Sequence, residues 1–456
     1  MADEKARELL KVIEGNYCIG CGACAAMQPE SIELQRPQNG LYRPELRPGA
    51  ALDMAERVCP FTSAGEDEDT LGRELFGDAP HHSAYLGHYR EIWAGHVVEE
   101  PYRAAGSSGG MGTWLLAEAL RQGVVDRVIH VRAREGSLGE PLFGYEISEH
   151  LAQVQAGSKS RYYPIEISQV VRQVHETPGK YAFVGIPCFL KALRNICAND
   201  PVMKERVVFF VGLFCGHMKT ADFAASLAWQ LGIAPDDLAA VDFRRKLANR
   251  GANDYGFSAS DGAGRQVEAP MADLFGREWG LGFFKPQACE FCDDVVGELA
   301  DISVGDAWLP QYVGDPKGTN VLIVRTAAAA GLVAAAHGDK RLDIEPLSAE
   351  DAYKSQEGGF HHRRGGLAYR LWLKDRAKQW RPRKRVSPQR FHLSFIRRRI
   401  YKLRSYLSQY SHLAFARARE QKSFAVFPEL MRKPVEKYRR LLLVEYYLKR
   451  IRRWRA

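Results

Sequence analysis

Apolar residues fall in short runs through the middle of the chain, and these runs alternate with segments that have the periodicity of helices. Residues 92–98, 124–132 and 181–186 each have the length and composition of a strand. Strands that alternate with helices are typical of a sheet with crossover helices. The pattern therefore predicts an α/β body with a mixed sheet from about residue 85 to residue 360.

The C-terminal part of the chain has a different pattern. Apolar residues recur every three or four positions with basic residues between them, which is typical of amphipathic helices. The first such stretch contains Leu393, Ile396, Ile400, Leu403 and Leu407, and the second contains Leu441, Val444, Leu448 and Ile451, followed by Arg452, Arg453 and Trp454. The sequence predicts a basic helical tail over residues 361–456.

Net charge also separates this tail from the rest of the chain. Residues 361–456 hold 29 Lys and Arg against 5 Asp and Glu, or +24, and the remainder holds 35 against 50, or −15, which together make the +9 of the whole chain. Such a tail suits an anionic membrane surface, the acidic body of the same chain or a partner subunit. Nucleic acid is disfavoured because no binding motif accompanies the charge.

Neither an export signal nor a membrane span is expected. Residues 1–5 lack the apolar region of a signal peptide, and no apolar run reaches the roughly 18 residues of a spanning helix. The expected location is the cytoplasm, with the inner face of the membrane as an alternative if the tail binds lipid.

Four cysteines near the N-terminus have the spacing of an iron–sulfur site. Two residues separate Cys18 from Cys21 and Cys21 from Cys24, and Cys59 follows 35 positions later. A 4Fe-4S cluster needs four thiolates, of which a tight loop supplies three and a distant turn the fourth. A structural zinc site, the alternative, prefers two C-x-x-C pairs. The spacing predicts a small ferredoxin-like 4Fe-4S domain over residues 1–80.

Four further cysteines stand at strand ends or in a C-x-x-C pair. They are Cys188, Cys215, Cys289 and Cys292. Four thiols are enough for a second 4Fe-4S cluster, and a zinc site is the competing metal interpretation. Free cysteine is also among the most buried residue types, so Cys188 and Cys215 have a purely structural interpretation as well. Cys197 is left over and is expected to be structural.

A turn rich in Ser and Gly lies between the first strand of the body and the helix that follows it. Residues 105–113 read Ala-Gly-Ser-Ser-Gly-Gly-Met-Gly-Thr. Free backbone N–H groups and the helix dipole favour an anion at such a place, and a phosphate group would suit it. The turn is not G-x-G-x-x-G, however, and glycines at turns are often steric necessities.

Several motifs, in consistent order over about residues 15–330, resemble the coenzyme F-420 hydrogenase/dehydrogenase beta-subunit family. They are Ser107-Ser108-Gly109-Gly110, Gly157-Ser158-Lys159-Ser160, the stretch at 183–188, Phe214-Cys215-Gly216, Cys289-x-x-Cys292 and the stretch at 300–308. This family includes deazaflavin-oxidising subunits of archaeal hydrogenases, plant 7-hydroxymethyl chlorophyll a reductase and bacterial proteins of extracellular-polysaccharide loci. The basic tail lies outside the resemblance.

The resemblance implies an FAD-containing electron-transfer module beside iron–sulfur clusters. The residues implied to line the flavin site are Ser107, Ser108, Gly109, Gly110 and Thr113, with Gly157, Ser158 and Lys159 opposite. N–H donors and a Lys charge suit the FAD pyrophosphate. The resemblance also implies that the second cysteine quartet holds a cluster. Asp301 and Asp306 match an acidic pair of the family, although exposed turn carboxylates are the more ordinary interpretation.

The predicted function follows from the cofactors, because FAD converts between one-electron clusters and two-electron hydride chemistry. The first interpretation is an FAD- and iron–sulfur-dependent oxidoreductase of a small-molecule substrate, linked to extracellular polysaccharide or envelope metabolism. The alternative is an electron-transfer subunit that oxidises or reduces a deazaflavin (coenzyme F-420) or ferredoxin for a partner enzyme. No residue is assigned as catalytic, and the pairs His81-His82 and His361-His362 are expected to be solvated loop histidines.

Overall fold

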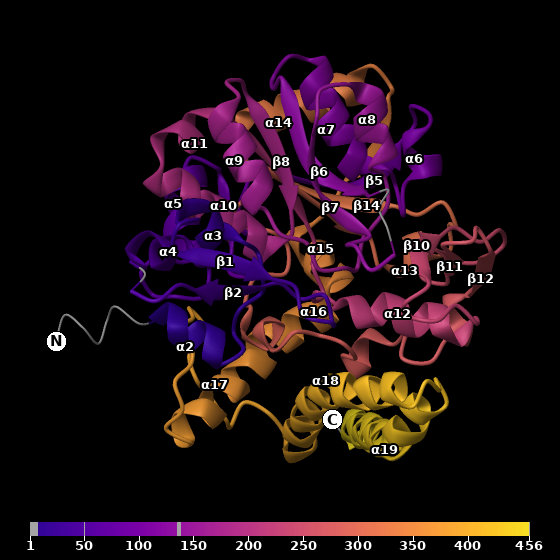
Figure 1. The fold of residues 1–456 in the computed structure, drawn as a ribbon. Coiled ribbons are helices and arrows are strands. Elements are labelled where there is room, and N and C mark those ends of the chain that lie inside the picture. The colour runs from indigo at the N-terminus through magenta and orange to yellow at the C-terminus, as the bar shows by residue number, and fades with distance from the viewer. Residues whose placement is uncertain (1–7, 50, 135–137, 456) are drawn as a thin grey trace.

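The computed structural model describes residues 8–49, 51–134 and 138–455, with side chains up to residue 451 (Figure 1). The expectations for residues 1–5 and for the side chains of Arg452, Arg453 and Trp454 lie outside the described residues.

A mixed sheet of eight strands forms the centre of the molecule (Figure 1). In spatial order the strands are β15 (Leu342–Pro346), β5 (Glu91–Val97), β14 (Asn320–Val324), β13 (Ile302–Asp306), β9 (Val207–Leu213), β8 (Tyr181–Gly185), β6 (Arg127–Ala133) and β7 (Phe143–Ser148). The middle strands β13, β9, β8 and β6 run parallel to one another. The strands outside them pair antiparallel. The predicted α/β fold with a mixed sheet is confirmed.

Helices cover both faces of this sheet, which explains why the central strands β8 and β9 are apolar throughout. One face carries α7 (Met111–Arg121), α8 (Leu151–Ala156) and α14 (Ala327–Gly338), and the other carries α9 (Ser168–Glu176), α10 (Pro187–Asn199) and α11 (Pro201–Arg206). Val184 of β8 packs in the same cluster as Trp114 of α7, whereas Phe183 packs with Phe189 of α10. Successive residues of one strand thus enter two different cores.

The N-terminal segment packs on the second of these faces. Its elements are α2 (Glu8–Glu14), α3 (Ala23–Met27), α4 (Asp53–Val58) and α5 (Glu68–Phe76), with the antiparallel pair β1 (Ile32–Gln35) and β2 (Arg43–Leu46). Leu9 and Val58 of this segment share one hydrophobic cluster with Leu193 of α10. The ferredoxin-like classification of residues 1–80 stays a prediction, but the described residues of this segment share their core with the body.

A second unit lies beside the sheet, to the right in Figure 1. It contains the three-stranded antiparallel sheet β10 (Leu238–Arg245), β11 (Gly256–Asp261) and β12 (Gln266–Pro270), together with α12 (Ala221–Gln230). The remaining short elements are β3 (His81–Ser83), β4 (Gly87–Tyr89), α6 (Tyr102–Ala105), α13 (Pro310–Val313), α15 (Ala349–Ser355), α16 (Glu357–His361) and three 3-10 turns at Met271–Asp273, Trp279–Leu281 and Gln287–Phe291.

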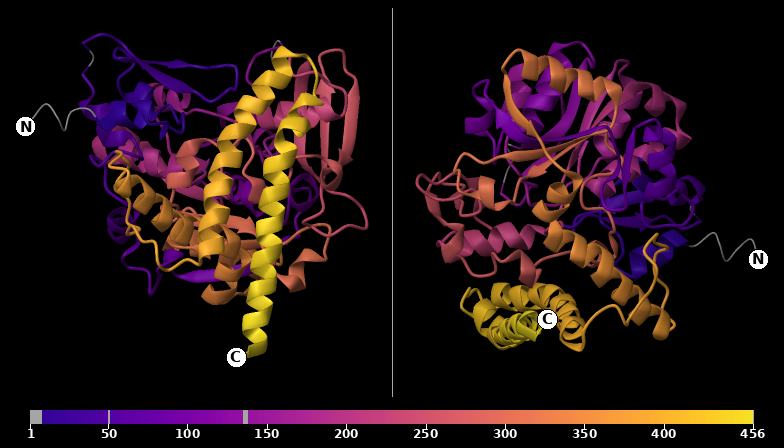
Figure 2. Two further views of the ribbon diagram at one scale, coloured as in Figure 1. Left: turned by 90° about the horizontal axis from the view of Figure 1, so that it is seen from below. Right: turned by 180° about the vertical axis from the view of Figure 1, so that it is seen from behind.

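The C-terminal segment is helical, and most of its apolar residues pack on the body. A π-helical turn at His362–Gly366 leads into α17 (Leu367–Arg376), and α18 (Phe395–Glu420) and α19 (Val426–Arg455) then lie side by side beneath the body (Figure 2). Ile400 and Leu407 are fully buried in a cluster with Phe284 of the body. The interpretation in which the tail packs on its own chain is therefore correct for this stretch.

The end of α19 differs, because it extends past the body (Figure 2). Val444, Leu448 and Ile451 are 44 to 49% exposed there. Binding of anionic lipid stays a prediction for this end of the helix alone. No helix within the described residues is long and apolar enough to cross a bilayer.

The chain was predicted to divide into three parts at about residues 80 and 360, but one hydrophobic cluster contains residues from all three. Leu371 of α17 belongs to the same cluster as Leu9 and Phe189. The division stays a prediction, but residues from all three parts pack together.

One histidine expectation is wrong: His362 is buried inside the π-helical turn, because α17 and α18 cover it, whereas His81 and His82 are exposed on β3.

We expect Phe415→Ala to destabilise the whole protein, because the side chain of Phe415 in α18 is fully buried against the body. Loss of a buried aromatic side chain costs roughly 3–5 kcal/mol. Leu413→Ala, on the same helix but 64% exposed, is the matched control and should change stability by no more than about 0.5 kcal/mol. Chemical unfolding of the full chain measures both. Equal stability of the two variants would show that the tail does not pack on the body in solution.

Candidate functional site

The four N-terminal cysteines line one cavity. Cys18 and Cys21 lie in the loop before α3, Cys24 lies within α3, and Cys59 directly follows α4. The fold thus brings together the four residues that the spacing predicted, and Cys59 arrives from a separate helix as expected.

Two glycines shape the loop that carries three of these cysteines. Gly20 and Gly22 have φ angles of +71° and +83°, a region that residues with a side chain rarely adopt. A Cβ on Gly22 would also lie 2.6 Å from Oε2 of Glu166. The loop can therefore turn tightly enough to direct three sulfurs toward one cavity.

The second cysteine quartet lines another cavity. Cys188 lies in the first turn of α10, directly after β8, and Cys215 lies two residues after β9. Because β8 and β9 are adjacent parallel strands, their carboxyl ends meet at one edge of the sheet. Cys289 and Cys292 come from the 3-10 turn at Gln287–Phe291 and the residue after it.

The two cavities are neighbours. Ile19, from the first cysteine loop, and Phe61, two residues after Cys59, line both of them. The two quartets therefore lie on either side of these two apolar side chains. Cys197 lines neither cavity; it is buried with its Sγ 3.6 Å from the carbonyl of Met203, as expected of a structural cysteine.

The sulfurs of each quartet belong to residues that line one cavity. In the described part of the chain, no three Cys, His, Asp or Glu side chains are arranged to hold a single metal ion. A lone zinc ion needs its sulfurs about 2.3 Å from one centre. Burial raises the pKa of every thiol in both quartets: Cys18, Cys21, Cys24, Cys59, Cys188, Cys215, Cys289 and Cys292. These sulfurs become thiolates only with a strong compensating positive charge nearby.

The Ser/Gly turn opens α7, as predicted, and lies against the loop that follows α8. Oγ of Ser107 accepts a hydrogen bond of 2.9 Å from the backbone N–H of Ser160. The hydroxyls of Thr113 and Ser158 are 3.3 Å apart. The fold therefore brings together the two segments that the resemblance placed opposite each other.

The glycines of this turn also have a steric role. A Cβ on Gly109 would lie 2.9 Å from the carbonyl oxygen of Gly95 in β5 and 2.7 Å from Oδ1 of Asn320 in β14. Gly110, with a φ of +85°, is the N-cap of α7. The steric interpretation is correct for Gly109, so replacement of this residue would test folding before it tested any ligand.

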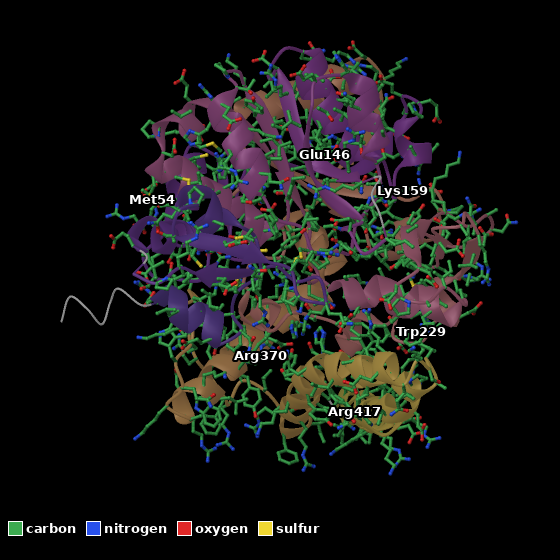
Figure 3. All side chains as sticks on the ribbon, in the orientation of Figure 1. Met54, Glu146, Lys159, Trp229, Arg370 and Arg417 are labelled. Carbon is green, nitrogen blue, oxygen red and sulfur yellow. The ribbon has the colours of Figure 1, made fainter. Side chains whose placement is uncertain are left out.

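Cationic side chains gather beside the turn. Nζ of Lys246 donates to the carbonyl oxygens of Ser108, at 2.9 Å, and Arg103. Burial, and after it the charges of Arg103, Lys159 and Arg244, lower the pKa of Lys246 to about 8. Lys159, on the β10 side of the molecule (Figure 3), has its own Nζ 3.4 Å from the carbonyl oxygen of Arg244. Lys159 also pairs with Asp242 at 3.2 Å and Arg103 with Asp315 at 2.6 Å, so these carboxylates offset part of the positive charge that would favour an anionic ligand.

The acidic pair of the resemblance is bound to arginines. Asp306 accepts two hydrogen bonds from Arg244, the shorter of 2.6 Å. Asp301 lies 3.2 Å from Arg194 and accepts a 2.8 Å bond from the backbone N–H of Phe210. The interpretation of Asp301 as an exposed turn carboxylate is wrong, because this residue is buried at the start of β13 where the two partners hold it.

Two family models match this chain. The model for the N-terminal part of the coenzyme F420 hydrogenase/dehydrogenase beta subunit matches residues 92–172, and the model for its C-terminal part matches residues 179–350. Together they span more than half of the chain. The chain belongs to the coenzyme F420 hydrogenase/dehydrogenase beta-subunit family. The resemblance in the sequence is thus confirmed, while the first cysteine quartet and the C-terminal helices lie outside the matched residues.

Relatives of this beta-subunit family member include components of redox enzymes. One component of the F(420)H(2) dehydrogenase of Methanosarcina mazei is 23% identical over 336 residues, which cover 70% of this chain and 82% of that protein. The beta subunit of the coenzyme F420 hydrogenase of Methanothermobacter thermautotrophicus is 24% identical over 248 residues, covering 53% and 79%. The coenzyme F420-dependent sulfite reductase of Methanocaldococcus jannaschii is 24% identical over 334 residues, covering 70% and 46%.

A chain of the F420-reducing [NiFe] hydrogenase complex from Methanosarcina barkeri is also similar in structure. It superimposes with a TM-score of 0.49 at 17% identity and covers 64% of this chain and 96% of its own length.

Several residues of the candidate sites of this family member were not predicted from the sequence. Arg244 and Lys246 follow one another closely at the end of β10, but Lys246 contacts Ser108 across 138 positions of sequence. Arg363 contacts two sulfurs of the second quartet, although it falls in the part of the chain assigned to a separate tail. The signal available in the sequence was the cluster of cations at the end of β10. It applied to Arg244 and Lys246 but not to Arg363.

Proposed function

We propose that this chain is an electron-transfer subunit that carries electrons between a soluble carrier, a deazaflavin such as coenzyme F420 or a ferredoxin, and a partner enzyme. The observation that supports this most directly is the pair of adjacent cysteine quartets within a beta-subunit fold. The relatives are named for F420 chemistry, which favours the carrier over an oxidoreductase of polysaccharide or envelope metabolism.

The donor sets of both cavities fit a 4Fe-4S cluster. Each offers four thiols and otherwise apolar side chains and backbone, apart from Arg363 in the second. Cys18, Cys21, Cys24 and Cys59 would hold the first cluster, and Cys188, Cys215, Cys289 and Cys292 the second. Such clusters exchange single electrons when bound. Ile19 and Phe61 keep water from the space between the quartets, which favours direct passage of an electron.

The Ser/Gly turn and its cations fit the pyrophosphate of FAD, which would supply two-electron chemistry. The residues that would hold it are Ser107, Ser108, Gly109, Gly110, Thr113, Gly157, Ser158 and Lys159. Lys246 and Arg103 are added to these by their contacts with the same turn. A helix N-terminus with three flanking cations suits two phosphate charges.

We expect close to eight irons per chain in anaerobically prepared protein. Cys59→Ala and Cys188→Ala should each lose about four irons, because each removes one ligand from a different quartet. Cys197→Ala is the matched control, since Cys197 is a buried cysteine outside both cavities, and it should retain all eight. Metal analysis with acid-labile sulfide measures this. Zinc in place of iron, or equal losses in Cys197→Ala, would contradict the assignment.

We expect Lys159→Gln to weaken flavin binding about tenfold to a hundredfold, because a hydrogen bond to a charged group contributes roughly 1.5–3 kcal/mol. Titration of FAD into flavin-depleted protein, followed by flavin fluorescence, gives the Kd. Lys204→Gln is the control, since Lys204 is exposed on α11. The proposed flavin site is wrong if both variants bind FAD as tightly as the unaltered protein.

Rapid mixing of a reduced carrier with the oxidised protein can test which carrier exchanges electrons with it. Reduced coenzyme F420, added anaerobically to oxidised protein in a stopped-flow instrument, should bleach the visible absorption of the protein, and reduced ferredoxin is the second carrier to try. Cys59→Ala should accept fewer electrons per chain than Cys197→Ala. If neither carrier reduces protein that holds eight irons and flavin, the oxidoreductase of a small metabolite becomes the better interpretation.

A further inference from the structure

One arginine lies directly against the second cysteine quartet. The side chain of Arg363 comes from the π-helical turn at His362–Gly366 and is 2% exposed. Its Nη1 donates to Sγ of Cys292 at 2.6 Å, and its Nη2 lies 3.5 Å from Sγ of Cys215. The same two nitrogens donate to the backbone carbonyls of Asp294 and Gly216. The guanidinium is thus fixed between two sulfurs and two carbonyls.

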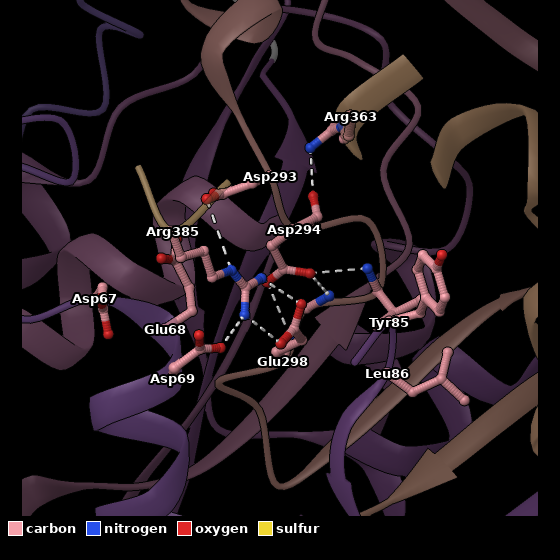
Figure 4. Close-up of polar contacts among 12 residues, drawn as sticks. Asp67, Glu68, Asp69, Tyr85, Leu86, Asp293, Asp294, Glu298, Arg363 and Arg385 are labelled. Carbon is pink, nitrogen blue, oxygen red and sulfur yellow. Dashed lines mark hydrogen bonds and ion pairs between the residues drawn. The ribbon is translucent and has the colours of Figure 1, made fainter. Parts of the chain in front are cut away.

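No carboxylate within the described residues forms an ion pair with Arg363, although four acidic side chains lie close to the quartet. Arg385 forms a two-point ion pair with Glu298, and Asp294 accepts instead from the backbone N–H groups of Val296, Gly297 and Glu298 (Figure 4). Glu290 lies 2.9 Å from Nε of Arg370, and Asp293 lies 3.6 Å from both Lys384 and Arg385. The nearby carboxylates are therefore occupied by other partners.

A buried guanidinium without an anion is costly, by several kcal/mol. Apart from a smaller attraction by Asp294, the sulfurs of Cys292, Cys215 and Cys289 are the groups left to supply that anion, and they do so only as thiolates. Thiolates at this depth in turn require the charge of a bound cluster. The position of Arg363 is therefore electrostatically favourable when the second quartet is loaded.

The first quartet has no equivalent cation. Its sulfurs accept from backbone N–H groups instead: Gly20 donates to Cys18 at 3.3 Å, and those of Ala23, Ala25 and Phe61 act on Cys21, Cys24 and Cys59. Arg43 and Lys191 act on Cys18 and Cys59 only through longer-range attraction and donate no hydrogen bond to them. A cation thus contacts sulfurs of the second quartet directly, whereas the first quartet has no such contact within the described residues.

We propose that Arg363 holds the reduction potential of the second cluster above that of the first, so that an electron moves downhill from the first quartet to the second. This inference rests on the proposed function, because it requires both clusters. In the step, the first cluster loses one electron and is oxidised, the second gains it and is reduced, and no bond forms or breaks. A fixed cation favours the state with the added electron, and hydrogen bonds to the sulfurs act in the same direction.

The C-terminal segment keeps Arg363 in place. Arg370 of α17 donates to the carbonyl oxygens of Glu290 and His362, at 2.8 and 2.9 Å. Tyr401 of α18 donates to the carbonyl oxygen of His361. Because a π-helical turn inserts an extra residue, it directs Arg363 inward. Residues beyond the match to the beta-subunit models, which ends at 350, thereby become part of the second site.

The test is a redox titration of the full chain, prepared anaerobically and followed by electron paramagnetic resonance. Cys59→Ala and Cys188→Ala assign the signals of the second and first clusters. In Arg363→Gln, the ratio of reduced to oxidised second cluster at a fixed potential should fall at least tenfold, which is about 59 mV for one electron. The first cluster should be unchanged. Arg363→Lys, which retains the charge, should shift the second cluster less.

Arg325→Gln is the matched control. Arg325 is also fully buried and donates to Ser303 and to backbone carbonyls, but it contacts no cysteine. Both potentials should stay unchanged in this variant. An equal shift in Arg325→Gln would show that loss of any buried cation has the same effect, and would overturn the specific role of Arg363.

The remaining outcomes separate this inference from the proposed function. Unaltered protein with fewer than eight irons would contradict the proposed function. Eight irons in Arg363→Gln with an unchanged second potential would overturn the inference alone. If Arg363→Gln loses four irons, Arg363 is needed to assemble the second site, and the inference about its potential is overturned.

Discussion

The burial of cysteine sulfur is the constraint on which the other features of this structure depend. A thiolate removed from water must meet positive charge or hydrogen bonds, and eight cysteines surround two cavities within one hydrophobic core. The N-terminal segment must therefore dock tightly on the sheet, because Ile19 and Phe61 close both cavities at once. The parallel strands β8 and β9 contribute Cys188 and Cys215 at their adjacent carboxyl ends, so the sheet itself sets the position of half of the second quartet.

The sequence could predict those features of the site whose signal is local. Three cysteines within seven residues, separated by glycines, indicate a loop that directs sulfurs to one place. The second quartet was harder, since its members come from three segments that meet only in the folded chain. Their number suggested the grouping, and the family resemblance favoured a cluster over zinc or purely structural cysteines. Alternating apolar runs likewise predicted the sheet, because successive residues such as Phe183 and Val184 must both be apolar when both faces are covered.

Contacts between residues far apart in the sequence could not be predicted from such local signals. Nothing near Lys246 in the sequence indicates that its Nζ reaches the carbonyl oxygen of Ser108, and nothing near Arg363 indicates cysteine partners. A lysine or arginine in a basic run is ordinarily solvated, so composition argued against burial in both cases. The same reasoning separated the tail from the body, although Ile400 and Leu407 carry the apolar pattern that buries α18. For α18, the apolar periodicity was a more reliable signal than the net charge, because an apolar helix face has to be buried against another part of a protein.

The charge asymmetry of the chain has a different meaning once these contacts are known. Arg363, Arg370, Lys384 and Arg385 all belong to the basic C-terminal fifth, yet all four are largely or fully buried at the acidic stretch around Cys292. Asp293 and Glu298 would be uncompensated buried charges without them. The acidic body and the basic tail are thus complementary sides of one network around the second quartet. A surplus of cations remains on the outside of α18 and α19, and it is this outer surplus, not the full +24, that is available to a membrane or a partner subunit.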